Sequence, residues 1–198
     1  MKNKVLVAYA TNAGSTADVA EAIGEALGQE GAQVDVRPIK EVREVSSYDA
    51  VVVGGPMILG WHRGAVKFLK QHRKALSRVP VAYFMTALKL TAMAETGLDT
   101  VPIYQDPRLA KPPQDPNKLS FKERFATVQS YLGPALKKVP QVKPVSVAFF
   151  AGRLDYSKLN IFHMLFVMLI IGATPGDFRN WEAVRDWAAS VRPLLLEA

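Results

Sequence analysis

The sequence predicts an α/β fold in which a parallel β-sheet is covered by helices on both faces. Short apolar runs of strand type alternate along the chain with segments whose apolar residues recur at helical spacing. One stretch, residues 49–55 (DAVVVGG), has a continuous apolar run after its aspartate and ends in glycine, as expected of a strand buried on both faces. The segments that follow these runs are rich in Gly, Thr or Pro, and ligands of such sheets bind at the carboxyl ends of the strands.

The first half of the chain supplies three strands and two helices. Residues 5–8 form a short apolar run, and residues 15–29 repeat their apolar side chains with helical periodicity before glycines end the pattern. Residues 32–39 alternate between polar and apolar, as in a second strand, and 49–55 form the third. In residues 64–76 the apolar side chains lie near one stripe and most basic ones lie off it, which predicts an amphipathic helix.

The second half supplies two more strands and two more helices. Residues 79–86 are expected to form the fourth strand and 143–152 the fifth. Between them, residues 95–118 are polar, contain five prolines and are expected to be a loop insertion, whereas 119–136 are expected to be helical. The amphipathic segment 180–195 is expected to be the last helix.

Composition limits the function classes. A chain of 198 residues fits one domain, expected to span residues 1–198, and the absence of cysteine excludes disulfides, thiolate chemistry and cysteine-bound clusters. Met1 is followed almost directly by a strand, without an apolar signal-peptide stretch, so a cytoplasmic location is expected. The net charge of +7 favours an anionic partner such as nucleic acid, an acidic protein or a membrane face, but an ordinary basic surface explains it equally well.

The loop between the first strand and the first helix reads TNAGST, residues 11–16. The hydroxyls of Thr11, Ser15 and Thr16 can donate to an anion, Gly14 allows close approach, and the N–H groups of the following helix point toward it. The loop has no lysine and fits neither the P-loop pattern nor G-x-G-x-x-G. The alternative is that Ser15 or Thr16 only caps the helix, and the loop alone does not decide between the two.

This unit resembles the phosphate-binding loop of flavodoxins, whose usual form is [T/S]-x-T-G-x-T. Thr11, Gly14 and Thr16 match, and Ala13 replaces the central threonine. Residues 48–76 also resemble the flavodoxin-like menaquinone-dependent protoporphyrinogen oxidases. So do the stretches VSVAFFAGRLDYSKLNIFHMLFVMLIIG and DFRNWEAVRDWA near the C-terminus, while the likeness is weakest across the proline-rich insertion.

The resemblance implies a flavodoxin-like three-layer sandwich with a five-stranded parallel sheet in the order 2-1-3-4-5. It implies FMN as the cofactor, with its 5′-phosphate in the loop and its ring between the loops that follow the third, fourth and fifth strands. The candidate cofactor-binding residues are Thr11, Asn12, Ala13, Gly14, Ser15, Thr16, Pro56, Met57, Ile58, Leu59, Gly60, Trp61, Thr86, Ala87, Leu88, Lys89, Gly152, Arg153, Leu154 and Asp155. No catalytic side chain is expected, since a flavin carries its own redox chemistry, and the three histidines lack metal-ligand spacing.

Three side chains of these loops have alternative roles. Trp61 either stacks on the flavin or covers its edge, or it packs against the next helix. Lys89 either supports the pyrimidine edge of the ring together with the backbone amides of its loop, or faces solvent. Arg153 either meets an acidic group of a substrate or pairs with Asp155.

An apolar segment at residues 158–172 precedes the last helix. It is too short to cross a bilayer, which takes about 20 apolar residues. A helix that is apolar on every side is buried, self-associated or in contact with lipid. Residues 159–171 are therefore expected either to meet the membrane surface or a quinone, or to pack against the insertion or a second subunit of a homodimer.

Three functions follow from the resemblance and the residues. The first is an FMN oxidoreductase that passes electrons to a quinone and oxidises protoporphyrinogen IX, an acidic tetrapyrrole of haem biosynthesis, at the inner face of the membrane. The second is an electron-carrier flavodoxin that serves a redox-partner protein. The third is a non-redox FMN-binding or anion-binding scaffold that docks to a membrane. The basic charge and the apolar segment favour the enzyme, and nucleic acid is not among the expected partners.

Overall fold

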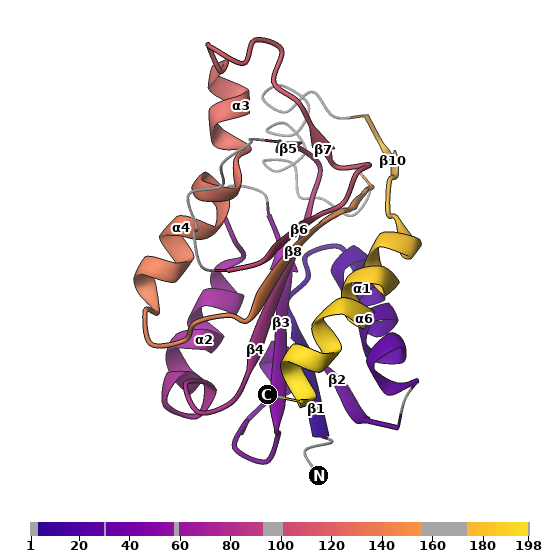
Figure 1. The fold of residues 1–198 in the computed structure, drawn as a ribbon, viewed down its shortest axis with the longest axis vertical. Coiled ribbons are helices and arrows are strands. Elements are labelled where there is room, and N and C mark those ends of the chain that lie inside the picture. The colour runs from indigo at the N-terminus through magenta and orange to yellow at the C-terminus, as the bar shows by residue number, and fades with distance from the viewer. Residues whose placement is uncertain (1–3, 30, 58–59, 93–100, 156–173, 198) are drawn as a thin grey trace.

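The central element of the protein is a six-stranded parallel sheet in the order β2-β1-β3-β4-β8-β6 (Figure 1). The computed structural model describes residues 4–29, 31–57, 60–92, 101–155 and 174–197. The strands are β1 (Lys4–Tyr9), β2 (Gln33–Pro38), β3 (Ala50–Pro56), β4 (Val81–Ala87), β6 (Ile103–Gln105) and β8 (Ser146–Ala151). The five predicted strands are present in the predicted order, which confirms the α/β fold.

Helices cover both faces of the sheet, which gives three layers (Figure 1). Helices α1 (Ser15–Gly28) and α6 (Trp181–Leu196) pack together on one face. Helices α2 (Arg63–Leu76) and α4 (Val128–Lys138) lie on the other. The segments of α1, α2 and α6 were predicted from apolar residues at helical spacing, and α4 lies largely within the predicted helix 119–136. The residues that these helices bury are mostly apolar.

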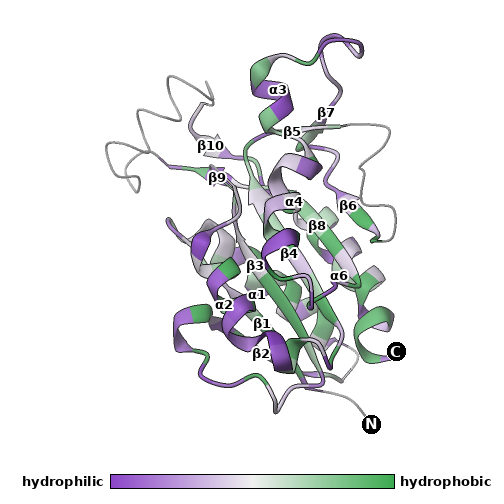
Figure 2. Cartoon of the chain, turned by 90° about the vertical axis from the view of Figure 1, so that its left-hand side faces the viewer, coloured by the Kyte–Doolittle hydropathy of each residue, from purple (hydrophilic) through white to green (hydrophobic). Residues whose placement is uncertain are grey.

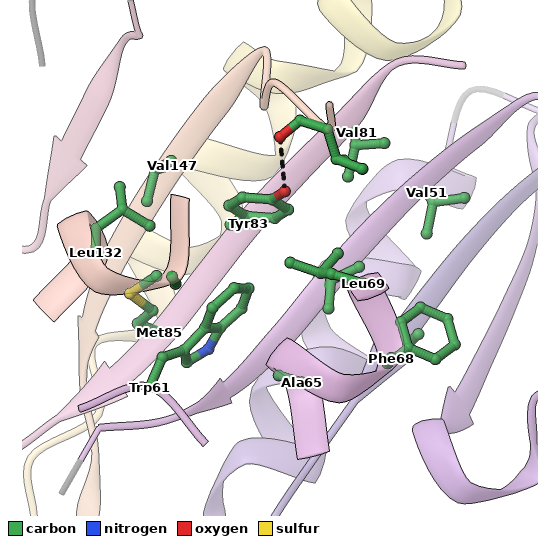
Figure 3. Close-up of a cluster of buried hydrophobic side chains, with 14 of the residues drawn as sticks. Val51, Trp61, Ala65, Phe68, Leu69, Val81, Tyr83, Met85, Leu132 and Val147 are labelled. Atoms are coloured by element: carbon green, nitrogen blue, oxygen red, sulfur yellow. Dashed lines mark hydrogen bonds between the residues drawn. The ribbon is translucent and has the colours of Figure 1, made fainter. Parts of the chain in front are cut away.

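Side chains of the central strands alternate between two cores. In β4, Tyr83 and Met85 pack toward α2 and α4, whereas Phe84 packs toward α1 and α6. Figure 3 shows the first core, where the hydroxyl of Tyr83 donates to the carbonyl of Val142 at 3.2 Å. In the second core the Phe84 ring covers Gly54, where an added Cβ would lie 1.9 Å from the ring. Figure 2 shows the hydrophobic colour concentrated on these strands.

The proline-rich insertion differs from the expected loop. Its described part contains β6, which adds a sixth strand beside β8, and β7 (Ala110–Lys111), which pairs with β5 (Leu90–Thr91). The prediction of a five-stranded sheet was therefore wrong by one edge strand. Three residues of mixed polarity are too short a run to produce a strand signal, and β6 is stabilised by pairing with β8 rather than by its own sequence.

The predicted helix at 119–136 is also divided. The structure has α3 (Phe121–Phe125) and then α4, with Ala126 and Thr127 between them. Thr127 has extended backbone, and its hydroxyl accepts a hydrogen bond from the N–H of Ser130, so it caps a new helix. Threonine occurs both at helix caps and inside helices, so the residue type at position 127 did not indicate the break.

Smaller elements complete the fold. They are a 3-10 turn at Ile39–Glu41, β9 (Arg153–Leu154) and β10 (Gly176–Asp177), the last two paired antiparallel. The apolar segment 158–172 lies wholly outside the described residues. Within the described part of the chain, no helix is long and apolar enough to cross a membrane.

Candidate functional site

The loops that follow β1, β3, β4 and β8 meet at one edge of the sheet, as predicted from the parallel topology (Figure 1). Hydrogen bonds tie them together in pairs. The hydroxyls of Thr16 and Thr86 are 2.8 Å apart, the N–H of Arg153 donates to the Ser15 hydroxyl at 3.1 Å, and the N–H of Met57 donates to the Thr86 carbonyl at 2.8 Å. Loops far apart in sequence therefore form one cluster.

The start of α1 has the features of an anion site. Gly14 is the N-cap residue with φ of 86°, a left-handed conformation suited to glycine, and no side-chain hydrogen bond caps the helix. The described residues also provide no acceptor for the backbone N–H groups of Ser15 and Thr16. These donors lie at the N-terminus of α1, the positive end of the helix dipole, which favours an anion.

The hydroxyls of Ser15 and Thr16 do not cap α1. Both side chains are buried, with residue exposures of 9% and 2%, and they point to neighbouring loops instead. Ser15 accepts from Arg153, so its own proton stays available to donate, and Thr11 likewise accepts from the N–H of Gly14 at 2.9 Å. The interpretation of Ser15 or Thr16 as a simple helix cap is therefore wrong.

His62 links the loop at residues 11–16 to the loop after β3. It is the N-cap of α2, where its Nδ1 accepts the N–H of Gly64 at 3.0 Å. Its Nε2 lies 3.1 Å from Oδ1 of Asn12. Because Nδ1 accepts, the proton must be on Nε2, which then donates to Asn12. Burial lowers the pKa of His62, which favours this neutral form.

Trp61 folds inward from the loop after β3. It is 6% exposed, and its ring lies 5.0 Å from the Tyr83 ring, within the core beneath α2 (Figure 3). Its Nε1 has no hydrogen-bond partner among the described residues. Met57 and Trp61 form a bridge that closes the loop, and Gly60 at its tip has φ of 110°. Ile58 and Leu59, two of the predicted flavin contacts, lie outside the described residues.

The loop after β4 is held from below by α4. Thr86 and Ala87 are the buried last residues of β4, while Leu88 and Lys89 are half-buried. The hydroxyl of Tyr131, from α4, donates to the carbonyl of Lys89 at 3.1 Å, and burial raises the pKa of Tyr131 to about 12. Tyr131 therefore stays protonated, and its hydrogen bond to Lys89 fixes the position of this loop.

The loop after β8 lies against the end of β4 and against the start of α1. The N–H of Gly152 donates to the carbonyl of Ala87 at 2.9 Å, and a Cβ added at Gly152 would lie 3.8 Å from the Ser15 hydroxyl. Arg153 and Leu154 form β9, and Asp155 is the next residue. All four loops predicted to hold a flavin are thus adjacent at their described residues.

Asp106 is a buried residue that the sequence did not reveal. Its carboxylate is fully buried and accepts the N–H groups of Arg108 and Ala151 and the side-chain amide of Asn180, at 2.9 to 3.0 Å. It joins the end of β6 to the end of β8 and to the N-cap of α6. Since Asn180 is 74 positions away, no local pattern could have shown this role.

Arg179 holds the segment before α6 to the start of α1. Its guanidinium pairs with Asp18, in the first turn of α1, and with Asp177, and it lies 4.6 Å from the ring of Trp181. The paired Arg179 holds the pKa of Asp177 below its usual range. These contacts fix the first turn of α1, from which the uncapped N–H groups project.

A cleft of about 1150 Å³ borders the site on the side of α2 and α4. Its walls include Met57 and Trp61 from one loop and Leu88 and Lys89 from another. Its basic lining residues are Arg63, Lys89, Lys122, Arg124 and Lys138. Among the described lining residues there is no acidic side chain, so the cleft suits an apolar molecule with negative charge.

The described residues fit FMN in their donor set. Uncapped N–H groups, the hydroxyls of Thr11 and Ser15 and the open space beside Gly14 suit a phosphate ester. The loops at Met57 and Leu88 provide apolar surface for a ring system. No group of three or more potential metal ligands occurs in the part of the chain that the structure describes.

Comparisons with known proteins agree with this arrangement. The family profile described as "Flavodoxin domain" matches residues 6–179. Protoporphyrinogen IX dehydrogenase (quinone) of Escherichia coli (strain K12) is 23% identical, over 96% of each chain. The protein of the same name from Leishmania major is 26% identical, over 98% of this chain and 76% of its own length. The solution structure of two-electron reduced Megasphaera elsdenii flavodoxin matches with a TM-score of 0.50 at 13% identity, covering 94% of this chain and 98% of that one, which shows the fold alone.

Proposed function

The chain belongs to the flavodoxin domain family, and on this premise we propose that it is an FMN-dependent oxidoreductase that passes electrons to a quinone. The observation that carries the proposal is the uncapped start of α1. Gly14 has no side chain to cap the helix, and the hydroxyls of Ser15 and Thr16 are engaged with Arg153 and Thr86. The backbone N–H groups of this turn remain available to a ligand. Membership of the flavodoxin domain family suggests FMN, which carries a phosphate, as that ligand.

The four loops divide the work of holding FMN. Residues 11–16 bind the phosphate, and the loops at Met57–Trp61, Thr86–Lys89 and Gly152–Asp155 enclose the ring. When bound, FMN supplies the electron transfer. The protein's own part is to fix the cofactor and exclude water, and the bonds from Met57 to Thr86 and from Gly152 to Ala87 keep the enclosing loops at fixed separations.

The electron donor is protoporphyrinogen IX, so that the protein acts in haem biosynthesis. Two supports exist for this finer assignment. Relatives from Escherichia coli and Leishmania major carry the name protoporphyrinogen IX dehydrogenase (quinone). The cleft beside the flavin loops is apolar and basic, with Arg63 and Lys89 close to the loops, which suits a large apolar substrate that carries carboxylates.

Anaerobic stopped-flow measurements on the FMN-loaded protein test this assignment. Protoporphyrinogen should bleach the flavin absorbance, and a menaquinone analogue should restore it. Lys89→Gln should raise the KM for the porphyrinogen, and Lys70→Gln, which removes an exposed lysine of α2 away from the cleft, should not. A protein that binds FMN but is not reduced by the porphyrinogen would instead be an electron carrier.

A further inference from the structure

Helix α3 has the reverse of the usual amphipathic arrangement. Its two phenylalanines, Phe121 and Phe125, are 65% and 58% exposed, and they lead the exposed large apolar side chains of the described chain. Its carboxylate, Glu123, is buried. A short helix that places a carboxylate inward and two aromatic rings in water requires a reason, because burying phenylalanine normally stabilises the fold.

Hydrogen bonds enforce this orientation. Glu123 accepts the N–H of Gln114 and both the N–H and hydroxyl of Ser120, at 2.6 to 2.8 Å, in a capping box that lowers its pKa to about 2. Thr91 donates to the carbonyls of Glu123 and Ala126 at 3.0 and 2.7 Å. The helix is therefore anchored through its polar side, and Phe121 and Phe125 are left side by side with ring centroids 4.7 Å apart.

The surroundings of the two rings are basic. Residues 107–138 contain seven lysines and arginines and two acidic residues, one of which is the buried Glu123. Lys122 and Arg124 alternate with the phenylalanines on α3 and are exposed, as is Lys118 just before it. Figures 1 and 2 both show α3 at the end of the molecule opposite the N-terminus, beyond the carboxyl edge of the sheet.

From this arrangement we infer that α3 docks the protein on an anionic lipid surface, with Phe121 and Phe125 inserted among the acyl chains and Lys118, Lys122 and Arg124 at the headgroups. Aromatic rings flanked by basic residues are the pattern of interfacial anchors. A second copy of the chain fits less well, because a symmetric contact through α3 would bring Lys122 and Arg124 of both copies together. A five-residue helix also offers little area to a folded partner, since stable interfaces bury on the order of 1,000 Å² or more.

Docking through α3 would also orient the cleft. Phe121 and Phe125 belong to the walls of the cleft that borders the flavin loops, so its mouth would face the lipid. A quinone acceptor is itself dissolved in lipid, so this consequence rests on the proposed function. The docking itself does not, because vesicle binding is measured without FMN turnover.

Vesicle flotation tests the inference. Wild-type protein should float with vesicles of phosphatidylcholine and phosphatidylglycerol, and should bind much less to pure phosphatidylcholine or at high salt. Phe121→Ser/Phe125→Ser should reduce binding by at least about tenfold, and Lys122→Glu/Arg124→Glu should do the same. Lys70→Glu/Lys74→Glu makes the same change in net charge on exposed residues of α2 and should retain most of the binding.

Three results would overturn the inference. The first is no flotation of the wild type, and the second is flotation that the α3 variants leave unchanged. The third is a wild-type dimer in sedimentation that the double serine variant converts to monomer, which would assign α3 to self-association. FMN content and thermal midpoint, measured on every variant, should match the wild type, so a loss of docking is separable from a failure to fold or to bind flavin.

Discussion

Replacing Gly14 by alanine separates the ligand role of this glycine from its structural role. At φ of 86° an L-residue is strained by about 1–2 kcal/mol, which for a chain of this size lowers the midpoint of thermal unfolding by about 2–8 °C. No protein atom lies within 4 Å of the added Cβ, so no clash increases this cost. The open space beside Gly14 is where the phosphate is proposed to bind, so the methyl group should interfere with it.

The expected result is a loss of FMN affinity of about tenfold or more, equivalent to about 1.4 kcal/mol. Gly31 provides a matched control. It has φ of 88°, its added Cβ also meets no atom within 4 Å, and it lies beyond the opposite end of α1, about 20 Å away at 1.5 Å per residue. Gly31→Ala should lose similar stability and keep wild-type affinity, as measured by quenching of FMN fluorescence on titration with apoprotein.

A Gly14→Ala variant that binds FMN as tightly as the wild type while its thermal midpoint falls would refute the phosphate-binding role of this glycine. An equal loss of affinity in Gly31→Ala would refute it as well, because the loss would then reflect general destabilisation. Thermal midpoints by circular dichroism on the same apoproteins give the stability side of the comparison.

Two further predictions concern the frame of the site. Burial lowers the pKa of His62 below the ordinary histidine value of 6.5. The cap that His62 makes on α2 therefore stabilises the fold fully at pH values above 6.5, and this contribution is lost as the pH falls through the pKa of the folded state. Compared with His62→Asn, a cap that does not titrate, the wild type should lose about 1 kcal/mol in urea unfolding between about pH 7.5 and about pH 5, and parallel pH curves would contradict the assignment. Gly54→Ala places a methyl group 1.9 Å from the Phe84 ring and should destabilise the fold by about 1–3 kcal/mol, whereas an unchanged midpoint would mean that this core is looser than described.

Much of the fold could be predicted because most strands of this sheet have a recognisable apolar pattern in the local sequence. Residues 49–55 and 79–86 are mostly apolar, as expected of strands buried on both faces, and the structure buries nearly every residue of β3 and β4. Strand β6 and the break before Thr127 were missed because neither depends on local pattern. The first is held by pairing with β8, and the second by one threonine hydroxyl.

The candidate site was predictable to the level of its loops and not of its side chains. The topology brings residues 11–16 beside Thr86 and Gly152, as expected. The inward fold of Trp61 could not be derived, because an aromatic residue on a loop can equally turn toward a ligand or toward the core. The network of Asp106 with Asn180 depends on tertiary neighbours alone.

The central claim is that the loop at residues 11–16 binds the phosphate of FMN. The most direct test is a comparison of FMN with riboflavin, which has the same ring without the phosphate, by isothermal titration of the apoprotein. We predict one FMN bound per chain, with an affinity far above that for riboflavin and lost selectively in Gly14→Ala. Equal affinities for the two flavins, or no binding of either, would contradict the account.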